Sequence, residues 1–195
     1  MRVGQIERKT SETHVKVSLG LDGTGSHSIK TGVGFFDHLL SQFARHGLYD
    51  LTVSAKGDLH VDFHHTVEDV GICLGQALIR ALAEGTGIAR FGHALAPMDE
   101  ALVLVALDIS GRGFSSVSLN TPAHKVGTFD VELAPEFLRA FAVNGGFTLH
   151  VRQISGENTH HLLEATFKGL GLALRQATAL DPRQTGIPST KGSLL

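Results

Sequence analysis

The chain has 195 residues, 42% of them hydrophobic, and its 17 basic and 19 acidic side chains give a formal net charge of -2. This balance excludes a broad positive surface for nucleic acid or an anionic membrane. The longest wholly apolar run, Ala101–Leu107, is far below the roughly 18 residues that span a bilayer, and the polar start lacks the apolar core of a signal peptide. We therefore expect a cytoplasmic protein that acts on a small molecule, with no nucleic-acid or membrane partner.

The first half of the chain predicts two strands, a helix, a third strand and a long helix. Glycine-rich turns separate the strand patterns, and the helices have apolar residues at helical spacing. In chain order we predict strands at His14–Leu21 and near Ser28–Thr31, a helix at Phe35–Arg45, a strand at Leu48–Ala55, and a helix that begins at His64 and ends near Gly85.

The same order of elements recurs in the second half. We interpret this recurrence as an internal duplication, because residues also match between the halves, as Phe43-Ala44 does with Phe141-Ala142. The predicted elements are strands at Leu102–Ile109 and Phe114–Leu119, a helix at Ala134–Val143, a strand at Phe147–Ile154, and a helix that begins at His160 and ends before Asp181.

This organisation predicts an α+β fold made of an internally duplicated pair of half-domains. Each half-domain would be a small mixed sheet with two helices on one face, and the helix layers of the two halves would pack together. Since no Pro/Gly/Ser-rich linker divides the chain, we expect residues 1–195 to form a single domain of two pseudo-repeats, about 1–90 and 91–195. The one cysteine, Cys73, has apolar neighbours in a predicted helix, which indicates a buried side chain and not a reactive thiol or a metal ligand.

Histidine is the compositional outlier, with 12 residues, and a His-His-x-x-Glu cassette opens each predicted long helix. Successive side chains of a helix diverge by about 100°, so His64 and Glu68 share a face, whereas His65 points away from it. Adjacent histidines therefore suggest two metal ions. The second cassette, His160–Glu164, has the same geometry.

An alternative is that the paired histidines cap helices or lie on a solvated face, and for one isolated pair this explanation would be equally good. Two pairs at equivalent places in a duplicated chain favour metal binding. The positive end of a helix dipole disfavours a nearby cation, but Asp62, Glu68 and Glu164 would offset it. Imidazole and carboxylate without thiolate suit Mn, Fe or Zn, and an octahedral site with several such ligands favours manganese or iron.

The repeat suggests one further ligand in each half. His38 lies 26 residues before His64, and Glu136 lies 24 residues before His160 in the equivalent predicted helix. Both side chains can bind a hard divalent ion. Asp37 would either orient a ligand through its carboxylate or be an ordinary surface or capping aspartate.

Five motifs along the chain resemble the imidazoleglycerol-phosphate dehydratases of histidine biosynthesis. In order, they are GFFDHLLSQFARHG, DFHHTVEDVG, PMDEALV, GENTHHLLEATFKGLGLALRQAT and PSTKG. The match runs through nearly the whole chain. It implies a hydro-lyase with two manganese ions in a single catalytic domain, a duplicated fold of the ribosomal S5 domain 2-like type, and a homo-oligomer of 24 subunits with sites between the subunits.

The resemblance implies seven metal ligands, and the repeat adds Glu136, where many family members have histidine. The seven are His38, His64, His65, Glu68, His160, His161 and Glu164. From helix spacing and pseudo-symmetry, we predict that one ion is bound by His64, Glu68, Glu136 and His161. We predict that the other ion is bound by His38, His65, His160 and Glu164.

The implied reaction removes water from imidazoleglycerol phosphate and gives imidazoleacetol phosphate. The proton to be removed lies on a carbon without an adjacent carbonyl. We therefore expect metals on both ring nitrogens to stabilise an imidazolate, which expels the hydroxyl through a diazafulvene-like intermediate. Glu12, which matches a substrate-site glutamate of the family, is the predicted base, with a solvated strand residue as its alternative. Glu100 holds the equivalent place in the second half, where we expect a structural role.

The resemblance also implies residues that bind the phosphate of the substrate. Arginine suits phosphate because its planar fork makes bidentate contacts with two oxygens. The implied phosphate-binding residues are His46, Arg90, Arg112, Lys168, Ser189, Thr190 and Lys191.

Two other functions remain open from the residues. A dinuclear metallohydrolase acting on a phosphate ester would use similar ions and cations but would release inorganic phosphate. A cage-forming metal storage or carrier protein would bind metal, and substitution of Glu12 would have no further consequence.

Overall fold

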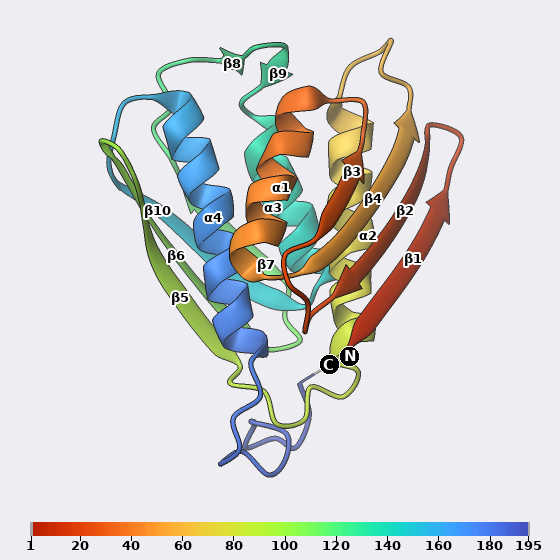
Figure 1. Cartoon of the computed structure of the whole chain (residues 1–195), viewed down its shortest axis with the longest axis vertical. Helices are drawn as coiled ribbons and strands as arrows, with labels where there is room; N and C mark the ends of the chain where they lie inside the picture. Colours follow the sequence, from red (N-terminus) through yellow and green to blue (C-terminus); the bar gives the residue numbers. More distant parts are fainter. Residues whose placement is uncertain (1, 195) are drawn as a thin grey trace.

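The computed structural model describes residues 2–194 and places them in an α+β fold with two four-stranded sheets and four helices (Figure 1). The first half contains β1 (Val3–Lys9), β2 (Thr13–Gly20), β3 (His27–Lys30), α1 (Gly34–Gly47), β4 (Asp50–Gly57) and α2 (His64–Leu82). The second half contains β5 (Phe91–Met98), β6 (Ala101–Ile109), β7 (Phe114–Ser118), α3 (Leu133–Asn144), β10 (Phe147–Ser155) and α4 (Thr159–Thr178). A small hairpin of β8 (Lys125–Val126) and β9 (Phe129–Asp130) precedes α3.

The two sheets have the same topology. The strand order is β1-β2-β4-β3 in the first sheet and β5-β6-β10-β7 in the second. In each sheet the first three strands are antiparallel, whereas the last strand, β3 or β7, is parallel to its neighbour. The repeated order confirms the predicted duplicated α+β fold with two mixed sheets.

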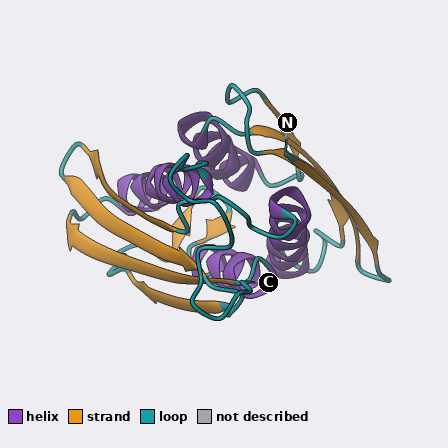
Figure 2. Cartoon of the chain, turned by 90° about the horizontal axis from the view of Figure 1, so that it is seen from below, coloured by secondary structure: helices purple, strands orange, loops and turns teal. Residues whose placement is uncertain are grey.

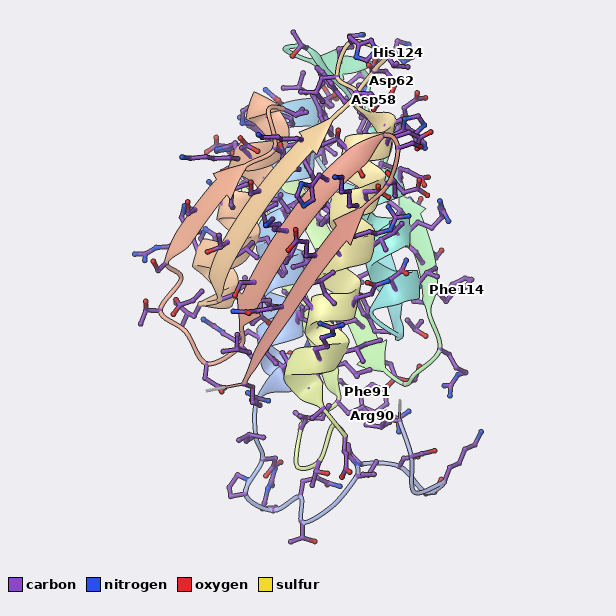
Figure 3. The ribbon with its side chains drawn as sticks, turned by 90° about the vertical axis from the view of Figure 1, so that its right-hand side faces the viewer. Asp58, Asp62, Arg90, Phe91, Phe114 and His124 are labelled. Atoms are coloured by element: carbon purple, nitrogen blue, oxygen red, sulfur yellow. The ribbon has the colours of Figure 1, made fainter. Side chains whose placement is uncertain are left out.

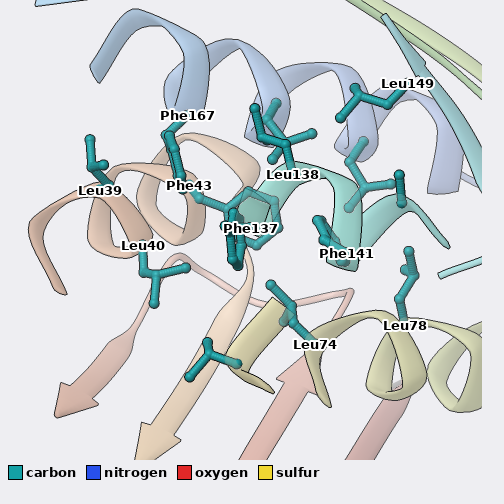
Figure 4. Close-up of a cluster of buried hydrophobic side chains, with 14 of the residues drawn as sticks. Leu39, Leu40, Phe43, Leu74, Leu78, Phe137, Leu138, Phe141, Leu149 and Phe167 are labelled. Atoms are coloured by element: carbon teal, nitrogen blue, oxygen red, sulfur yellow. The ribbon is translucent and has the colours of Figure 1, made fainter. Parts of the chain in front are cut away.

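The helices lie between the two sheets, and each helix of one half packs against a helix of the other half, α2 on α3 and α1 on α4 (Figure 2). Glycines allow this close approach. A Cβ on Gly75 of α2 would come within 2.6 Å of the Gly145 nitrogen, and a Cβ on Gly171 of α4 within 2.5 Å of the Phe43 carbonyl oxygen. Phe43 and Phe141, from equivalent positions of α1 and α3, meet in the core with ring centroids 5.9 Å apart (Figure 4).

Besides the small β8–β9 hairpin, the strands β1 and β5 are the elements that the sequence patterns do not predict. Each has only two buried positions, and one of them is a glycine, Gly4 in β1 and Gly92 in β5. The alternation of polar and apolar residues is therefore weak in both strands. Gly4 lies against the carbonyl of Ala77 in α2, and Gly92 lies against the carbonyl of Ala173 in α4, so that any side chain would overlap the helix. Equivalent glycines thus let the long helix of each half approach its sheet.

The direction of the helices gives the molecule two distinct ends. All four helices run the same way, with their N-termini at one end and the tail that follows α4 at the other (Figure 1). α4 has 20 residues and is about 30 Å long, which separates the two ends. The tail packs on the connection between the halves, where Gly87 donates to the carbonyl of Gly186 at 3.0 Å. Within residues 2–194, none of the helices is long and apolar enough to cross a membrane.

Candidate active site

One group of three side chains joins α1 to the first turns of α4. His160 and Glu164 stand one turn apart on α4, His38 approaches them from α1, and one ligand atom of each lies within 4.8 Å of the others. Glu164 Oε2 is 2.8 Å from His38 Nε2 and 3.1 Å from His160 Nε2. Burial alone would raise the pKa of Glu164, but hydrogen bonds from Lys168 and His38 lower it to about 2. An ionised carboxylate and two imidazoles therefore converge.

A second group joins α2 to α3 at equivalent positions of the other helix pair. Its members are His64, Glu68 and Glu136, again with ligand atoms within 4.8 Å of one another. Arg139, one turn after Glu136, contacts both carboxylates, and its Nη2 lies 3.3 Å from Glu68 Oε1. The hydrogen bond from Arg139 lowers the pKa of Glu136. Two carboxylates and one imidazole therefore converge here.

The second histidine of each cassette points away from the first, as the helix geometry predicts. The ring centroids lie 6.0 Å apart in the first pair and 6.2 Å apart in the second, and neither His65 nor His161 joins the ligand group of its neighbour. Nδ1 of His65 lies 2.9 Å from Asp58, and Nδ1 of His161 lies 2.8 Å from Glu100. A carboxylate at Nδ1 keeps the proton on that nitrogen, which leaves Nε2 as the atom that can bind a metal.

Within one chain, the structure brings together three of the four ligands that we predict for each ion. His65 and His161 lie outside the two groups, although both stand at the same end of the molecule. Among residues 2–194 of a single chain, neither complete set of four therefore forms. The assignment of eight ligands to two ions stays a prediction.

Glu12 and Glu100 lie in turns and contact His65 and His161, the two histidines outside the ligand groups. Glu12 is on the exposed turn before β2, where its Oε1 is 3.9 Å from Nε2 of His65. Glu100 is at the equivalent turn before β6 and contacts His161, and it also accepts a hydrogen bond from the backbone N–H of Asn158 at 2.9 Å. Glu100 therefore ties the start of α4 to its sheet.

Two of the predicted phosphate-binding residues lie on the face that α1 and α4 share. Lys168 is one turn after Glu164, and its Nζ lies 2.6 Å from Glu164 Oε1. Partial burial and the charge of Lys168 lower the pKa of His46. A cation thus adjoins the first group.

The remaining predicted phosphate-binding residues lie at the opposite end of the molecule. They are Arg90, Arg112, Ser189, Thr190 and Lys191. Arg90 has a left-handed backbone, with a φ of 71°, and its Nε lies 2.7 Å from Asp108. Its Nη1 donates to the carbonyl of Pro188 at 2.8 Å, which holds the tail in place. Figure 3 shows Arg90 toward the end of the molecule opposite Asp58. The structure therefore does not bring these residues to the ligand groups within one chain.

Two side chains at the site are not predicted from the sequence. Arg139 follows a glutamate by three residues, a helical spacing that could have indicated the ion pair. Asp58 lies in the loop after β4, and no spacing indicates its contact with His65. The carboxylate of Asp37 accepts from the backbone N–H and the hydroxyl of Thr31, so it ties the first turn of α1 to the segment after β3, and among the described residues no side chain caps the N-terminus of α1.

The two α+β halves share one topology, and each helix pair between them carries a group of imidazole and carboxylate donors that could hold a metal ion, an arrangement typical of metal-dependent enzymes. A family model described as imidazoleglycerol-phosphate dehydratase matches residues 31–174, and the chain belongs to this family. It is therefore a dehydratase, a lyase of histidine biosynthesis.

Named relatives and solved structures match nearly the whole chain. The imidazoleglycerol-phosphate dehydratase of Desulforamulus reducens is 62% identical over 193 residues, 99% of this chain and 98% of the relative. That of Moorella thermoacetica is 59% identical, with the same coverage. The crystal structure of the enzyme from Pyrococcus furiosus in complex with (S)-C348 has a TM-score of 0.84 at 43% identity and covers 97% of this chain and 100% of that one. The Staphylococcus aureus enzyme gives 0.83 at 38% identity, with 92% and 99% covered.

Proposed function

We propose that this chain converts D-erythro-imidazoleglycerol phosphate to imidazoleacetol phosphate with two divalent ions per site, both Mn²⁺. The observation that carries the proposal is the pair of three-residue His/Glu groups at equivalent places of the two halves. The names of the relatives support the substrate. Residues 1–195 would act as a single catalytic domain of two pseudo-repeats, about 1–90 and 91–195.

The donor sets of both groups suit divalent ions. Each combines imidazole nitrogen with carboxylate oxygen within 4.8 Å, and small side-chain rotations would bring such donors to the roughly 2.0–2.2 Å at which they bind a metal. When bound, the ions would supply Lewis-acid chemistry at the imidazole ring of the substrate, which the predicted imidazolate and diazafulvene route requires.

We assign the role of general base to Glu12. Its side chain is 52% exposed and lies beside His65, at the end of the molecule that carries both ligand groups. A carboxylate in this position can accept a proton from the carbon chain of a substrate whose ring is held nearby. In the second half, Glu100 bonds to His161 and to the backbone of α4, which supports the structural role expected for it.

A complete site would need more than one chain. Lys168 contacts Glu164 of one ligand group, whereas Arg90 and Lys191 lie at the other end of the molecule. The backbone N–H of Arg90 donates to the carbonyl of Ala177, which lies about 20 Å further along α4 than Glu164. A substrate of this size cannot bridge that distance. We therefore propose a homo-oligomer with sites between subunits, the 24-subunit shell that the family resemblance implies, acting in the cytoplasm.

The experiment is to incubate the manganese-loaded, assembled protein with imidazoleglycerol phosphate and to follow the product by mass spectrometry. We expect the loss of one water and a product that keeps its phosphate. Release of inorganic phosphate would instead identify a metallohydrolase, and an unchanged substrate with both metal sites full would identify a metal carrier. A Glu12→Gln variant should bind metal normally but dehydrate the substrate about 10²- to 10⁴-fold more slowly.

A further inference from the structure

The two ligand groups occupy equivalent positions but differ in one donor. His64 corresponds to His160 and Glu68 to Glu164, each pair with an identical side chain, whereas Glu136 of α3 stands where α1 has a histidine. The α2–α3 group therefore offers one imidazole and two carboxylates. The α1–α4 group, which contains His38, His160 and Glu164, offers two imidazoles and one carboxylate.

The basic side chains beside the two groups do not cancel this difference in donors. In the α2–α3 group, one cation, Arg139, faces two carboxylates, so the group keeps one more acidic side chain than basic ones. In the α1–α4 group, Lys168 lies 2.6 Å from Oε1 of Glu164, the only carboxylate of that group, and so balances its charge. With neutral histidines, the first group is more negative by one unit.

Because the two groups differ in their donors, they should also differ in the metal ions that they prefer. Carboxylate oxygens suit hard ions such as Mn²⁺ and Mg²⁺, and imidazole suits Zn²⁺, Ni²⁺ and Cu²⁺. Zn²⁺ binds more tightly than Mn²⁺ to most such sites, but its advantage should be larger where nitrogen donors dominate. The extra negative charge of the α2–α3 group, which has fewer nitrogen donors, helps that group to hold either Mn²⁺ or Zn²⁺.

We propose that the two groups are unequal metal sites, and that Glu136 makes them so. The α2–α3 group retains Mn²⁺, whereas the α1–α4 group exchanges first for an imidazole-preferring ion such as Zn²⁺. The inference rests on the proposed function to the extent that both groups hold metal. It concerns only how two different ions divide between them.

The test adds one equivalent of Zn²⁺ per chain to the manganese-loaded, assembled protein. About one Mn²⁺ per chain should be released, as measured by electron paramagnetic resonance of the free ion. Anomalous diffraction at the zinc and manganese edges should then place zinc at His38–His160–Glu164 and manganese at His64–Glu68–Glu136. An even distribution of zinc, or zinc first in the α2–α3 group, would overturn the proposal.

Two reciprocal variants serve as matched controls. Glu136→His gives both groups two imidazoles, and His38→Glu gives both groups two carboxylates, so each change should make zinc divide evenly. Circular dichroism and the assembled mass would verify that both variants fold. If the wild-type protein dehydrates its substrate but either variant still sorts zinc as the wild type does, only this inference fails. If the wild-type protein binds no metal, the proposed function fails with it.

Discussion

Glu100 holds His161 by a hydrogen bond of 2.8 Å between its Oε2 and Nδ1 of the imidazole ring. The pKa of Glu100 is lowered to about 2, first by this contact and then by the backbone N–H of Asn158, so the carboxylate is ionised throughout the physiological range. The contact leaves Nε2 as the free nitrogen of His161. Asp58 holds His65 in the same manner.

Glu100→Gln should weaken metal binding without unfolding the protein. The amide keeps the shape of the side chain but removes the charge that orients and polarises the imidazole, and losses at such positions are about 10- to 100-fold in metal affinity. Competition with a chelator measures the affinity. Asp99→Asn is the control, because Asp99 is the neighbouring residue, 77% exposed and 3.8 Å from the other ring nitrogen. Equal affinity in both variants would show that Glu100 has no part in metal binding.

Lys191→Ala should raise KM for the phosphorylated substrate about 10- to 100-fold, the effect of losing a charge-assisted hydrogen bond of about 1.5–3 kcal/mol. Steady-state kinetics of the full-length variant measures it. Arg183→Ala removes another exposed cation from the same tail and should leave KM unchanged. Deletion of the residues after Gly186 should have a severe effect, partly because it also removes the buried Leu194. A wild-type KM in Lys191→Ala would exclude the phosphate role.

Gly92→Ala should destabilise the fold by about 1–3 kcal/mol or more, because the new Cβ would overlap the carbonyl of Ala173 and force β5 away from α4. Urea denaturation measures the free energy of unfolding. Gly34→Ala is the control, since a Cβ there meets nothing within 4 Å. Gly4→Ala, at the equivalent place of the first half, should behave like Gly92→Ala. Two variants as stable as the control would contradict the close helix–sheet packing.

Cys73 should be unreactive in the native protein. Burial raises the pKa of its thiol to about 11, so at pH 8 only about one molecule in a thousand carries the thiolate, which is the nucleophile. The thiolate would accumulate only as the pH rises through 11. A disulfide reagent such as DTNB should label Cys73 only after denaturation. Complete labelling of the native protein within minutes at pH 8 would show that the side chain is accessible.

The fold class could be predicted because both halves repeat their strong patterns, but β1 and β5, the first strand of each sheet, could not. In β1 and β5 the buried positions are occupied by residues such as Gly4 and Gly92, whose value lies in having no side chain. Hydrophobic periodicity detects apolar side chains, so it does not detect a glycine that is needed because a strand and a helix approach closely. Prediction from periodicity therefore stops where the packing depends on small residues.

The candidate site, too, could be predicted only in part. Helix spacing predicts that His64 lies with Glu68 and His160 with Glu164, and the repeat links His38 and Glu136 to them, as the structure has it. Contacts made by loops, such as Asp58 with His65, follow no spacing. Nor does the spacing within one chain say where the metal-binding partners of His65 and His161 lie, because in the proposed oligomer those partners would belong to another chain.

The most direct test of the paired-metal account is a titration of the metal-free, assembled protein with Mn²⁺, with dehydration measured at each addition. We predict that activity rises until two ions are bound per chain, and that His38→Ala and His64→Ala each reduce the stoichiometry to one and abolish turnover. Full activity with a single ion per chain, or in either variant, would contradict the account.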